Sequence, residues 1–153
     1  MANHSPARLH AYDWAYMKMA MAMGELSYAK RKQVGAIIVS DNDQVISQGF
    51  NGTPVGFDNC CERVIPETGE LETLPEVLHA EANAITKCAK FGSTTKNGTL
   101  YVTLSPCINC AKLIIQSDIK RVVYLEDYRD STGLDLLRKC GIEVVKLSGV
   151  FDV

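Results

Sequence analysis

The chain carries the sequence TLYVTLSPCINC at residues 99–110, and this stretch decides the architecture. Residues 99–104 are rich in aliphatic, aromatic and β-branched side chains, which predicts a buried strand. We expect Pro106 to open a helix directly after this strand, because a proline in the first turn loses no intrahelical hydrogen bond. Cys107 and Cys110 then lie one turn apart on one face, near the positive end of the helix, where thiolates are favoured.

A second short motif, His79-Ala80-Glu81, lies at the start of a helix predicted over residues 78–91 and ended by Gly92. One imidazole and two thiolates make three of the four ligands of a tetrahedral zinc ion and leave the fourth position open for water. Glu81 is then available to move protons. Alone, C-x-x-C is also typical of a redox pair and H-x-E occurs by chance. Together, at two helix starts that follow strands, they indicate a catalytic zinc site.

The elements around these motifs alternate between strand and helix. A first amphipathic helix is predicted from apolar side chains at spacings of three and four, namely Tyr12, Tyr16, Met19, Met23 and Leu26. Further strands are predicted at residues 34–39, 45–50, 121–125 and 143–147. The first two form a hairpin, and a helix over residues 131–140 separates the last two. This order predicts an α/β fold, a three-layer α/β/α domain with a five-stranded mixed sheet.

The composition suits one compact domain over residues 1–153, with a core at about 9–147, because 46% of its 153 residues are apolar. Neither a signal-peptide pattern nor a membrane span is visible, so we expect a cytoplasmic protein with six reduced cysteines. A net charge of −2 and a pI near 5.9 argue against a nucleic-acid partner. Residues 52–75 form an irregular stretch too long for a simple connection, which predicts a functional insertion loop or an interface.

Four segments of the chain carry a family resemblance. They are QVGAIIV (33–39), GFNGTP (49–54), HAEANAI (79–85) and YVTLSPCINCAK (101–112). The zinc motifs among them are shared by zinc-dependent nucleobase deaminases in general. With GFNGTP and the insertion that follows, the chain resembles the deoxycytidylate (dCMP) deaminases of the cytidine deaminase superfamily, particularly the phage and bacterial type. The resemblance implies a cytidine deaminase-like fold and a hydrolase that converts dCMP to dUMP and ammonia, which supplies dUMP for thymidylate synthesis.

The resemblance also implies roles for individual residues. One Zn²⁺ ion per subunit is held by His79, Cys107 and Cys110, and Glu81 is the general acid/base that passes protons to N3 and to the leaving amine of cytosine. The residues implied to contact the substrate are Val34, Gly35, Asn51, Ser105 and Tyr128. Ala80 is added because the first turn of a helix presents unpaired backbone N–H groups that can contact the substrate. Two of these residues have structural alternatives that stay open: Asn51 also fits a turn cap, and Tyr128 fits a half-buried packing residue.

The 5′-phosphate of dCMP needs a cation, and the run Lys30-Arg31-Lys32 lies just before the first predicted strand. We expect Arg31 to contact the phosphate, because a guanidinium presents a fork that matches phosphate oxygens. Lys32 is the second choice. The alternative is that the whole run is a solvated surface.

The chain departs from the family at Ala29, where related bacterial proteins often carry a cysteine that belongs to a second, structural zinc site. We therefore expect one zinc ion per subunit. Cys60 and Cys61 are adjacent and cannot easily hold one ion together, whereas Cys88 and Cys140 are expected to be small buried apolar residues.

Regulation and assembly are implied by the resemblance alone. Many dCMP deaminases are hexamers activated by dCTP with Mg²⁺ and inhibited by dTTP, so we expect a regulated homohexamer, with no residue assigned to the effector site. A cytidine deaminase or a tRNA adenosine deaminase shares the zinc motifs and stays an alternative. A non-catalytic zinc-binding interaction module is less favoured, because it needs neither Glu81 nor an open coordination position.

Overall fold

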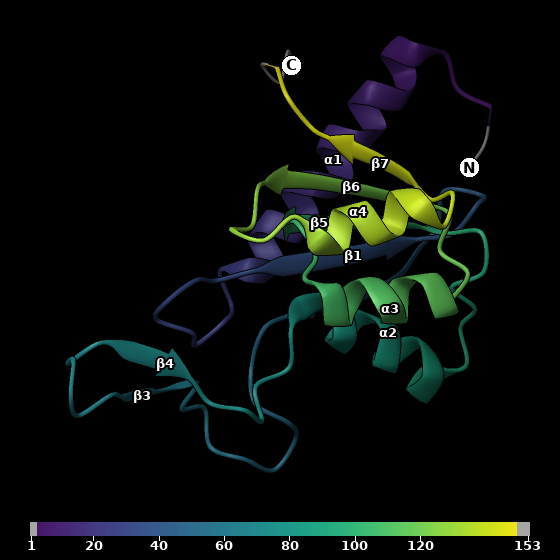
Figure 1. The fold of residues 1–153 in the computed structure, drawn as a ribbon. Helices are drawn as coiled ribbons and strands as arrows, with labels where there is room; N and C mark the ends of the chain where they lie inside the picture. The colour runs from purple at the N-terminus through teal and green to yellow at the C-terminus, as the bar shows by residue number, and fades with distance from the viewer. Residues whose placement is uncertain (1–2, 150–153) are drawn as a thin grey trace.

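The computed structural model describes residues 3–149 and contains a five-stranded mixed sheet in the order β2-β1-β5-β6-β7 (Figure 1). These strands are β1 (Gly35–Val39), β2 (Val45–Phe50), β5 (Thr99–Leu104), β6 (Arg121–Glu126) and β7 (Glu143–Lys146). β1 pairs antiparallel with both β2 and β5, whereas β5, β6 and β7 run parallel. Helices connect the successive strands of this parallel half, because parallel neighbours need a long crossover connection.

Helices cover both faces of the sheet. One face is covered by α1 (Pro6–Gly24), where Met17 and Ala20 pack against Ile37. The opposite face carries α2 (Ala80–Phe91), α3 (Ile108–Gln116) and α4 (Thr132–Lys139) (Figure 1). Successive residues of the central strands therefore enter different cores, as the alternation of side chains along a strand dictates. The arrangement confirms the predicted α/β class, with three layers and a five-stranded mixed sheet.

The buried face of α1 differs from the predicted apolar stripe. Met19 and Leu26 are 42% and 57% exposed, and Leu26 lies beyond the end of the helix. Met17 and Ala20 are fully buried in their place. The helix approaches the sheet closely here, because a Cβ on Gly35 would lie only 1.8 Å from the Ala20 carbonyl oxygen. Tyr16 is buried as predicted, and Tyr12 and Met23 pack against the same core, so the predicted stripe was right at three positions and wrong at Met19 and Leu26.

The two motif-bearing helices begin slightly later than predicted. α2 has His79 as its N-cap and ends at Gly92, whose φ of 74° confirms the predicted C-cap. α3 has Cys107 as its N-cap, so Pro106 precedes the cap instead of lying in the first turn. A proline at that position restricts the backbone without entering the helix. Both ligand motifs therefore lie at helix caps.

The insertion at residues 52–75 is not wholly irregular, which corrects the sequence prediction. It contains an antiparallel pair, β3 (Glu62–Val64) and β4 (Leu71–Thr73), that projects away from the main sheet (Figure 1). At the base of the insertion the backbones of Gly52 and Leu78 exchange hydrogen bonds of 3.1 and 2.8 Å. Strands of three residues are too short to produce a readable alternation of apolar and polar side chains.

Four of the six cysteines lie outside the zinc motif. Cys61 and Cys88 are buried, whereas Cys60 and Cys140 are exposed. Cys140 follows the last turn of α4 as its C-cap, so its predicted burial was wrong. None of the helices in residues 3–149 has the length and apolar character needed to span a bilayer.

A buried ion pair joins α1 to the sheet. The Asp13 carboxylate accepts hydrogen bonds from the Arg121 guanidinium at 2.6 and 2.7 Å and from the Tyr101 hydroxyl at 2.7 Å. The side chains of Asp13 and Arg121 are only 5% and 9% exposed. Loss of one partner of such a pair leaves the other charge buried and poorly compensated.

Asp13→Ala is therefore expected to lower the free energy of unfolding by about 3 kcal/mol, because Arg121 stays buried without this carboxylate. Urea denaturation of both proteins measures the difference. Asp135→Ala is the control, since Asp135 forms an exposed pair with Arg138 at 3.8 Å, whose loss is expected to cost less than about 0.5 kcal/mol. Equal losses in the two variants would contradict a special role for the buried pair.

Candidate active site

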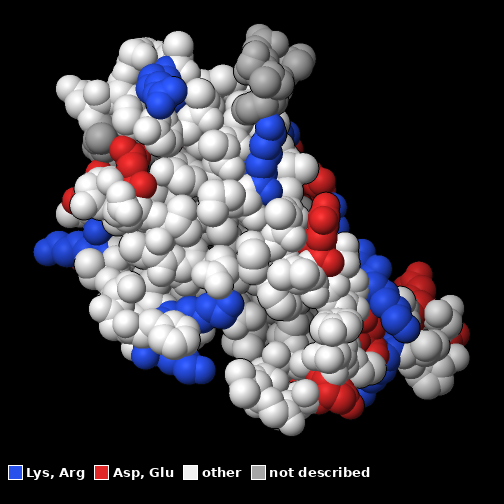
Figure 2. All heavy atoms as spheres, turned by 180° about the vertical axis from the view of Figure 1, so that it is seen from behind, with Lys and Arg blue, Asp and Glu red and all other residues white. Residues whose placement is uncertain are grey.

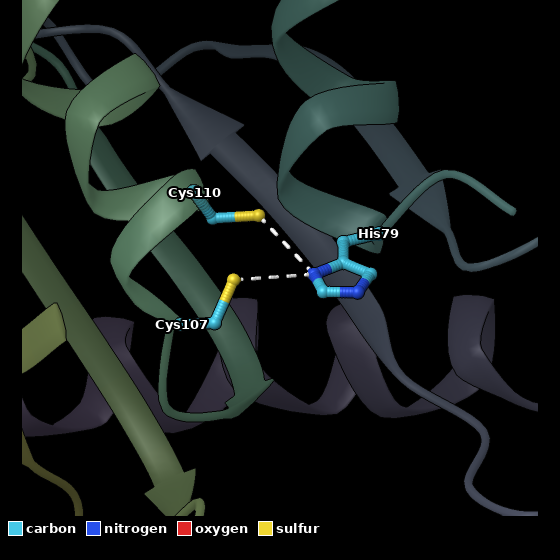
Figure 3. Close-up of side chains that lie close together, drawn as sticks. All are labelled: His79, Cys107 and Cys110. Carbon is cyan, nitrogen blue, oxygen red and sulfur yellow. Dashed lines mark hydrogen bonds between the residues drawn. The ribbon is translucent and has the colours of Figure 1, made fainter. Parts of the chain in front are cut away.

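Three possible metal ligands meet between the starts of α2 and α3 (Figure 3). The Sγ atoms of Cys107 and Cys110 lie 3.5 and 3.4 Å from Nδ1 of His79. His79 and Cys107 are the N-caps of their helices, and Cys110 lies in the first turn of α3. Within residues 3–149 this is the one group of at least three His, Cys, Asp or Glu side chains close enough to share a metal ion.

This donor set fits a zinc ion. Tetrahedral zinc with Zn–S bonds of about 2.3 Å and Zn–N bonds of about 2.0 Å separates nitrogen from sulfur by about 3.5 Å. The separations of 3.5 and 3.4 Å in the structure agree with that value. One imidazole and two thiolates leave the fourth position for water or substrate, which is the pattern of catalytic and not of structural zinc.

Hydrogen bonding and burial shift the protonation of these groups. A hydrogen bond with the Cys110 thiol lowers the pKa of Cys107 to about 3, and the same contact, together with burial, raises the pKa of Cys110. Burial raises the pKa of Glu81, which is only 4% exposed. A carboxyl group with a raised pKa can both accept and return a proton near neutral pH, as a general acid/base must.

Backbone contacts on the insertion side fix the start of α2. The hydrogen-bonded bridge between Gly52 and Leu78 brings the chain that follows β2 next to the residue before His79. One turn into the helix, the Asn83 amide donates to the Phe50 carbonyl at 2.8 Å. These contacts hold the backbone on both sides of His79 against the chain at the end of β2.

A close approach by α4 fixes the start of α3. A Cβ on Gly133 would lie 2.2 Å from the Pro106 carbonyl oxygen and 2.9 Å from that of Cys107. Any side chain at position 133 would consequently displace either α4 or the turn that presents the Cys107 thiolate. The thiolate pair thus depends on a glycine that lies outside the zinc motif.

A cavity of about 370 Å³ opens beside the metal ligands. It has the size typical of small-molecule sites in proteins. Glu81 is buried and Arg31 is exposed, so the cavity runs from a buried carboxyl group to a cationic rim. Most of the predicted site residues line it: Arg31, Val34, Asn51, His79, Ala80, Glu81, Ser105, Cys107 and Tyr128.

Asn51 lines this cavity, but its amide is engaged with the backbone. Its Oδ1 accepts from the Val34 N–H at 2.8 Å, and its Nδ2 donates to the Lys32 carbonyl at 2.8 Å. The amide therefore holds residues 32–34 against the cavity. This is the turn-holding role that the sequence left open as the alternative. A substrate that contacts the Asn51 amide must share it with these two backbone hydrogen bonds.

Of four other predicted substrate-contact residues, three line the cavity and one does not. Ser105 is buried, and its Oγ accepts from the Tyr128 N–H at 2.7 Å, which holds the half-buried Tyr128 beside the cavity. Gly35 is not among the lining residues, and its missing side chain instead admits α1 to the sheet. Val34, one residue earlier, does line the cavity.

The two candidate phosphate-binding cations differ in their partners. Nζ of Lys32 lies 2.5 Å from the Glu126 carboxylate, so its charge is already compensated. The Arg31 guanidinium donates to Oγ1 of Thr73 at 3.0 Å, which leaves its charge in place. Among the ion pairs of the described residues, none involves Arg31. This difference favours Arg31 over Lys32 as the anion-binding group.

Sequence reasoning missed six further residues that line the cavity, namely Ala29, Glu62, Thr73, Val77, Leu104 and Arg129. Arg129 had a readable signal, because it is a cation directly after the predicted Tyr128. Glu62 and Thr73 had none. Both come from the insertion hairpin. Glu62 accepts hydrogen bonds from backbone N–H groups that lie 31 and 32 residues earlier in the chain, and no local sequence pattern predicts a contact over that distance.

Comparisons with known proteins agree with this site. The family model described as the cytidine and deoxycytidylate deaminase zinc-binding region matches residues 11–126. A deoxycytidylate deaminase of Enterobacteria phage T4 is 35% identical over 84% of this chain and 86% of its own. The human deoxycytidylate deaminase is 41% identical over 76% of this chain and 66% of its own.

A solved structure also matches this chain in its fold. The dCMP deaminase of cyanophage S-TIM5, in complex with dCMP and dUMP, has a TM-score of 0.82 and 41% identity over 94% of this chain and 99% of its own. Residues 11–126, which the family model matches, contain both ligand motifs and four of the five strands of the main sheet. The chain therefore belongs to the cytidine and deoxycytidylate deaminase family.

Proposed function

We propose that the protein is a zinc-dependent dCMP deaminase, which hydrolyses dCMP to dUMP and ammonia. One observation carries the proposal: the His79/Cys107/Cys110 donor set and the buried Glu81 share a cavity whose exposed rim bears Arg31. Relatives named deoxycytidylate deaminase and the phage protein solved with dCMP and dUMP support this choice of substrate.

Zinc, when bound by the imidazole and the two thiolates, supplies a Lewis acid that makes water a better nucleophile near neutral pH. Glu81 takes a proton from the attacking water and donates it to N3 of cytosine, while the water oxygen bonds to C4. Glu81 then carries the second proton of that water to the exocyclic nitrogen. The bond from C4 to this nitrogen breaks, ammonia leaves, and C4 becomes the carbonyl of uracil.

The remaining lining residues are proposed to orient the nucleotide. Ala80 offers a backbone N–H in the first turn of α2, and the Ser105 carbonyl is the proposed partner of the leaving amino group. Val34, Asn51 and Tyr128 form the sides of the cavity. Arg31 is proposed to bind the 5′-phosphate, so the charged end of dCMP faces solvent and the base faces Glu81.

Surface charge supports a small substrate over tRNA. Figure 2 shows acidic and basic side chains interspersed on one face of the molecule, with a large neutral area between them. A protein that grips a polyanion is expected to carry a continuous basic surface instead. Incubation of the purified protein with dCMP, cytidine, dCTP and tRNA, with ammonia release as the readout, tests the choice of substrate. Turnover of cytidine or tRNA in preference to dCMP would refute it.

We further propose a single-domain cytoplasmic protein that forms a homohexamer, activated by dCTP with Mg²⁺ and inhibited by dTTP. Support comes from the family and from apolar side chains that the single chain leaves exposed in the insertion, such as Val55 at 96% and Phe57 at 58%.

Sedimentation is expected to detect a hexamer, as the family resemblance implies, in which the exposed apolar side chains of the insertion would be buried between subunits. The saturation curve for dCMP is expected to be sigmoidal and to become steeper at low substrate when dCTP and Mg²⁺ are added. The same curve measured with dTTP is the control, since dTTP is expected to lower the rate at low substrate where dCTP raises it. A monomer with a hyperbolic curve that ignores both nucleotides would contradict the proposal.

Cys107→Ala and Cys110→Ala are each expected to lose zinc and activity together, because two protein ligands do not retain a catalytic ion. Metal analysis of the purified variants, with ammonia release measured in parallel, checks this result. Cys140→Ala removes an exposed thiol outside the site and is expected to keep both zinc and activity. Stoichiometric zinc in either ligand variant would show that the ligands are assigned wrongly.

Glu81→Gln keeps the shape of the side chain but cannot carry protons, so we expect kcat to fall at least about a hundredfold. Zinc content should not change. Calorimetry should find dCMP affinity within about tenfold of the parent, a difference of no more than about 1.4 kcal/mol. Glu67→Gln, at an exposed position in the insertion, is the control. Near-parental turnover by the Glu81 variant would remove Glu81 from the mechanism.

A further inference from the structure

The insertion hairpin contains one carboxylate that is out of place for a surface strand. Glu62 is 8% exposed, whereas the next two residues of β3 are exposed. A buried carboxylate is costly unless hydrogen bonds satisfy it. Its Oε1 accepts from two consecutive backbone N–H groups, those of Lys30 at 2.8 Å and Arg31 at 3.1 Å. The hairpin is therefore bound to the backbone of the basic run.

The same rung of the hairpin also holds the Arg31 side chain. Thr73 is the cross-strand partner of Glu62, and its Oγ1 accepts from the Arg31 guanidinium at 3.0 Å. Two paired residues thus fix both the backbone and the guanidinium of one arginine. The next rung is closed by a salt bridge between Arg63 and Glu72, which ties the strands together at the surface.

These contacts orient the Arg31 guanidinium without neutralising it. The Thr73 hydroxyl is uncharged, and the Glu62 oxygen that binds this segment is occupied by backbone N–H groups. Asn51 holds the other end of the same segment through Lys32 and Val34. An arginine fixed in this way loses little conformational entropy when an anion binds, which increases affinity.

We propose that the insertion hairpin is the support of the phosphate-binding arginine, with Glu62 and Thr73 as positioning residues that determine the preference for a nucleotide over a nucleoside. The inference rests on the proposed function, because it assigns a role in binding dCMP. Neither residue touches the reacting atoms. Their effect is expected on KM for the phosphorylated substrate and not on the chemical step.

Steady-state kinetics of Glu62→Ala with dCMP and with deoxycytidine tests this role. We expect KM for dCMP to rise about tenfold, equivalent to about 1.4 kcal/mol, with kcat within twofold of the parent. Because deoxycytidine has no phosphate, its kcat/KM should stay within about twofold, which also shows that the variant is folded. Glu62→Gln keeps an oxygen that can accept both N–H bonds and should restore most of the preference. Glu67→Ala removes an equal charge from the exposed part of the insertion and is the matched control.

A double-mutant cycle with Arg31→Ala separates positioning from general damage. If Glu62 acts through Arg31, the double variant should discriminate between dCMP and deoxycytidine no worse than Arg31→Ala alone. The inference would be overturned if the losses of discrimination in the two single variants added up in the double variant, or if activity fell equally on both substrates. It would also be overturned if either Glu62→Ala or Arg31→Ala alone caused no loss of discrimination. A Glu62→Gln variant as weak as Glu62→Ala would overturn it as well. Failure of the proposed function looks different, because the unmodified protein would then release no ammonia from dCMP.

Discussion

The active site depends on one constraint: the starts of α2 and α3 must converge so that one imidazole and two thiolates reach a common point. N-caps are suited to this task, because a cap residue ends the preceding loop and its side chain projects from the helix end instead of its flank. His79 and Cys107 both use this position. The convergence is then fixed from outside the motifs, by the Gly52–Leu78 bridge on one side and by Gly133 on the other.

Around this rigid centre the substrate cavity is built largely from irregular backbone. The segment over residues 29–34 has no helix or strand of its own to satisfy its N–H and C=O groups. Side chains from distant parts of the chain do so instead, with Glu62 binding two N–H groups and Asn51 binding one N–H and one carbonyl. Because buried backbone groups must find partners, such a wall keeps its shape only while those side chains are present.

The contrast between local and distant contacts explains what the sequence could predict. The strand-turn-helix at residues 99–110 is encoded by neighbours, and its two thiolates were identified as ligands from their spacing together with the H-x-E motif at residues 79–81. The buried stripe of α1 was partly misplaced, because the choice between Met17 and Met19 depends on the approach of Gly35 and not on the helix itself. Glu62 could not be found at all. Its partners are 31 and 32 residues away, and its neighbours in β3 have the composition of an exposed strand.

The distribution of charge along the cavity gives the proposed substrate one productive direction. At the buried end, Glu81 and the two thiolates surround a position suited to zinc, and burial disfavours a second, uncompensated charge such as a phosphate there. At the exposed rim, the Arg31 guanidinium has no carboxylate partner within residues 3–149, whereas the neighbouring Lys32 is paired with Glu126. A nucleotide that entered phosphate first would carry its charge into the poorly solvated end of the cavity and away from the rim cation, Arg31. Entry base first places the phosphate in solvent beside Arg31 and the cytosine next to Glu81. The same separation of charge thus orients the substrate and keeps the acid/base group apart from the phosphate.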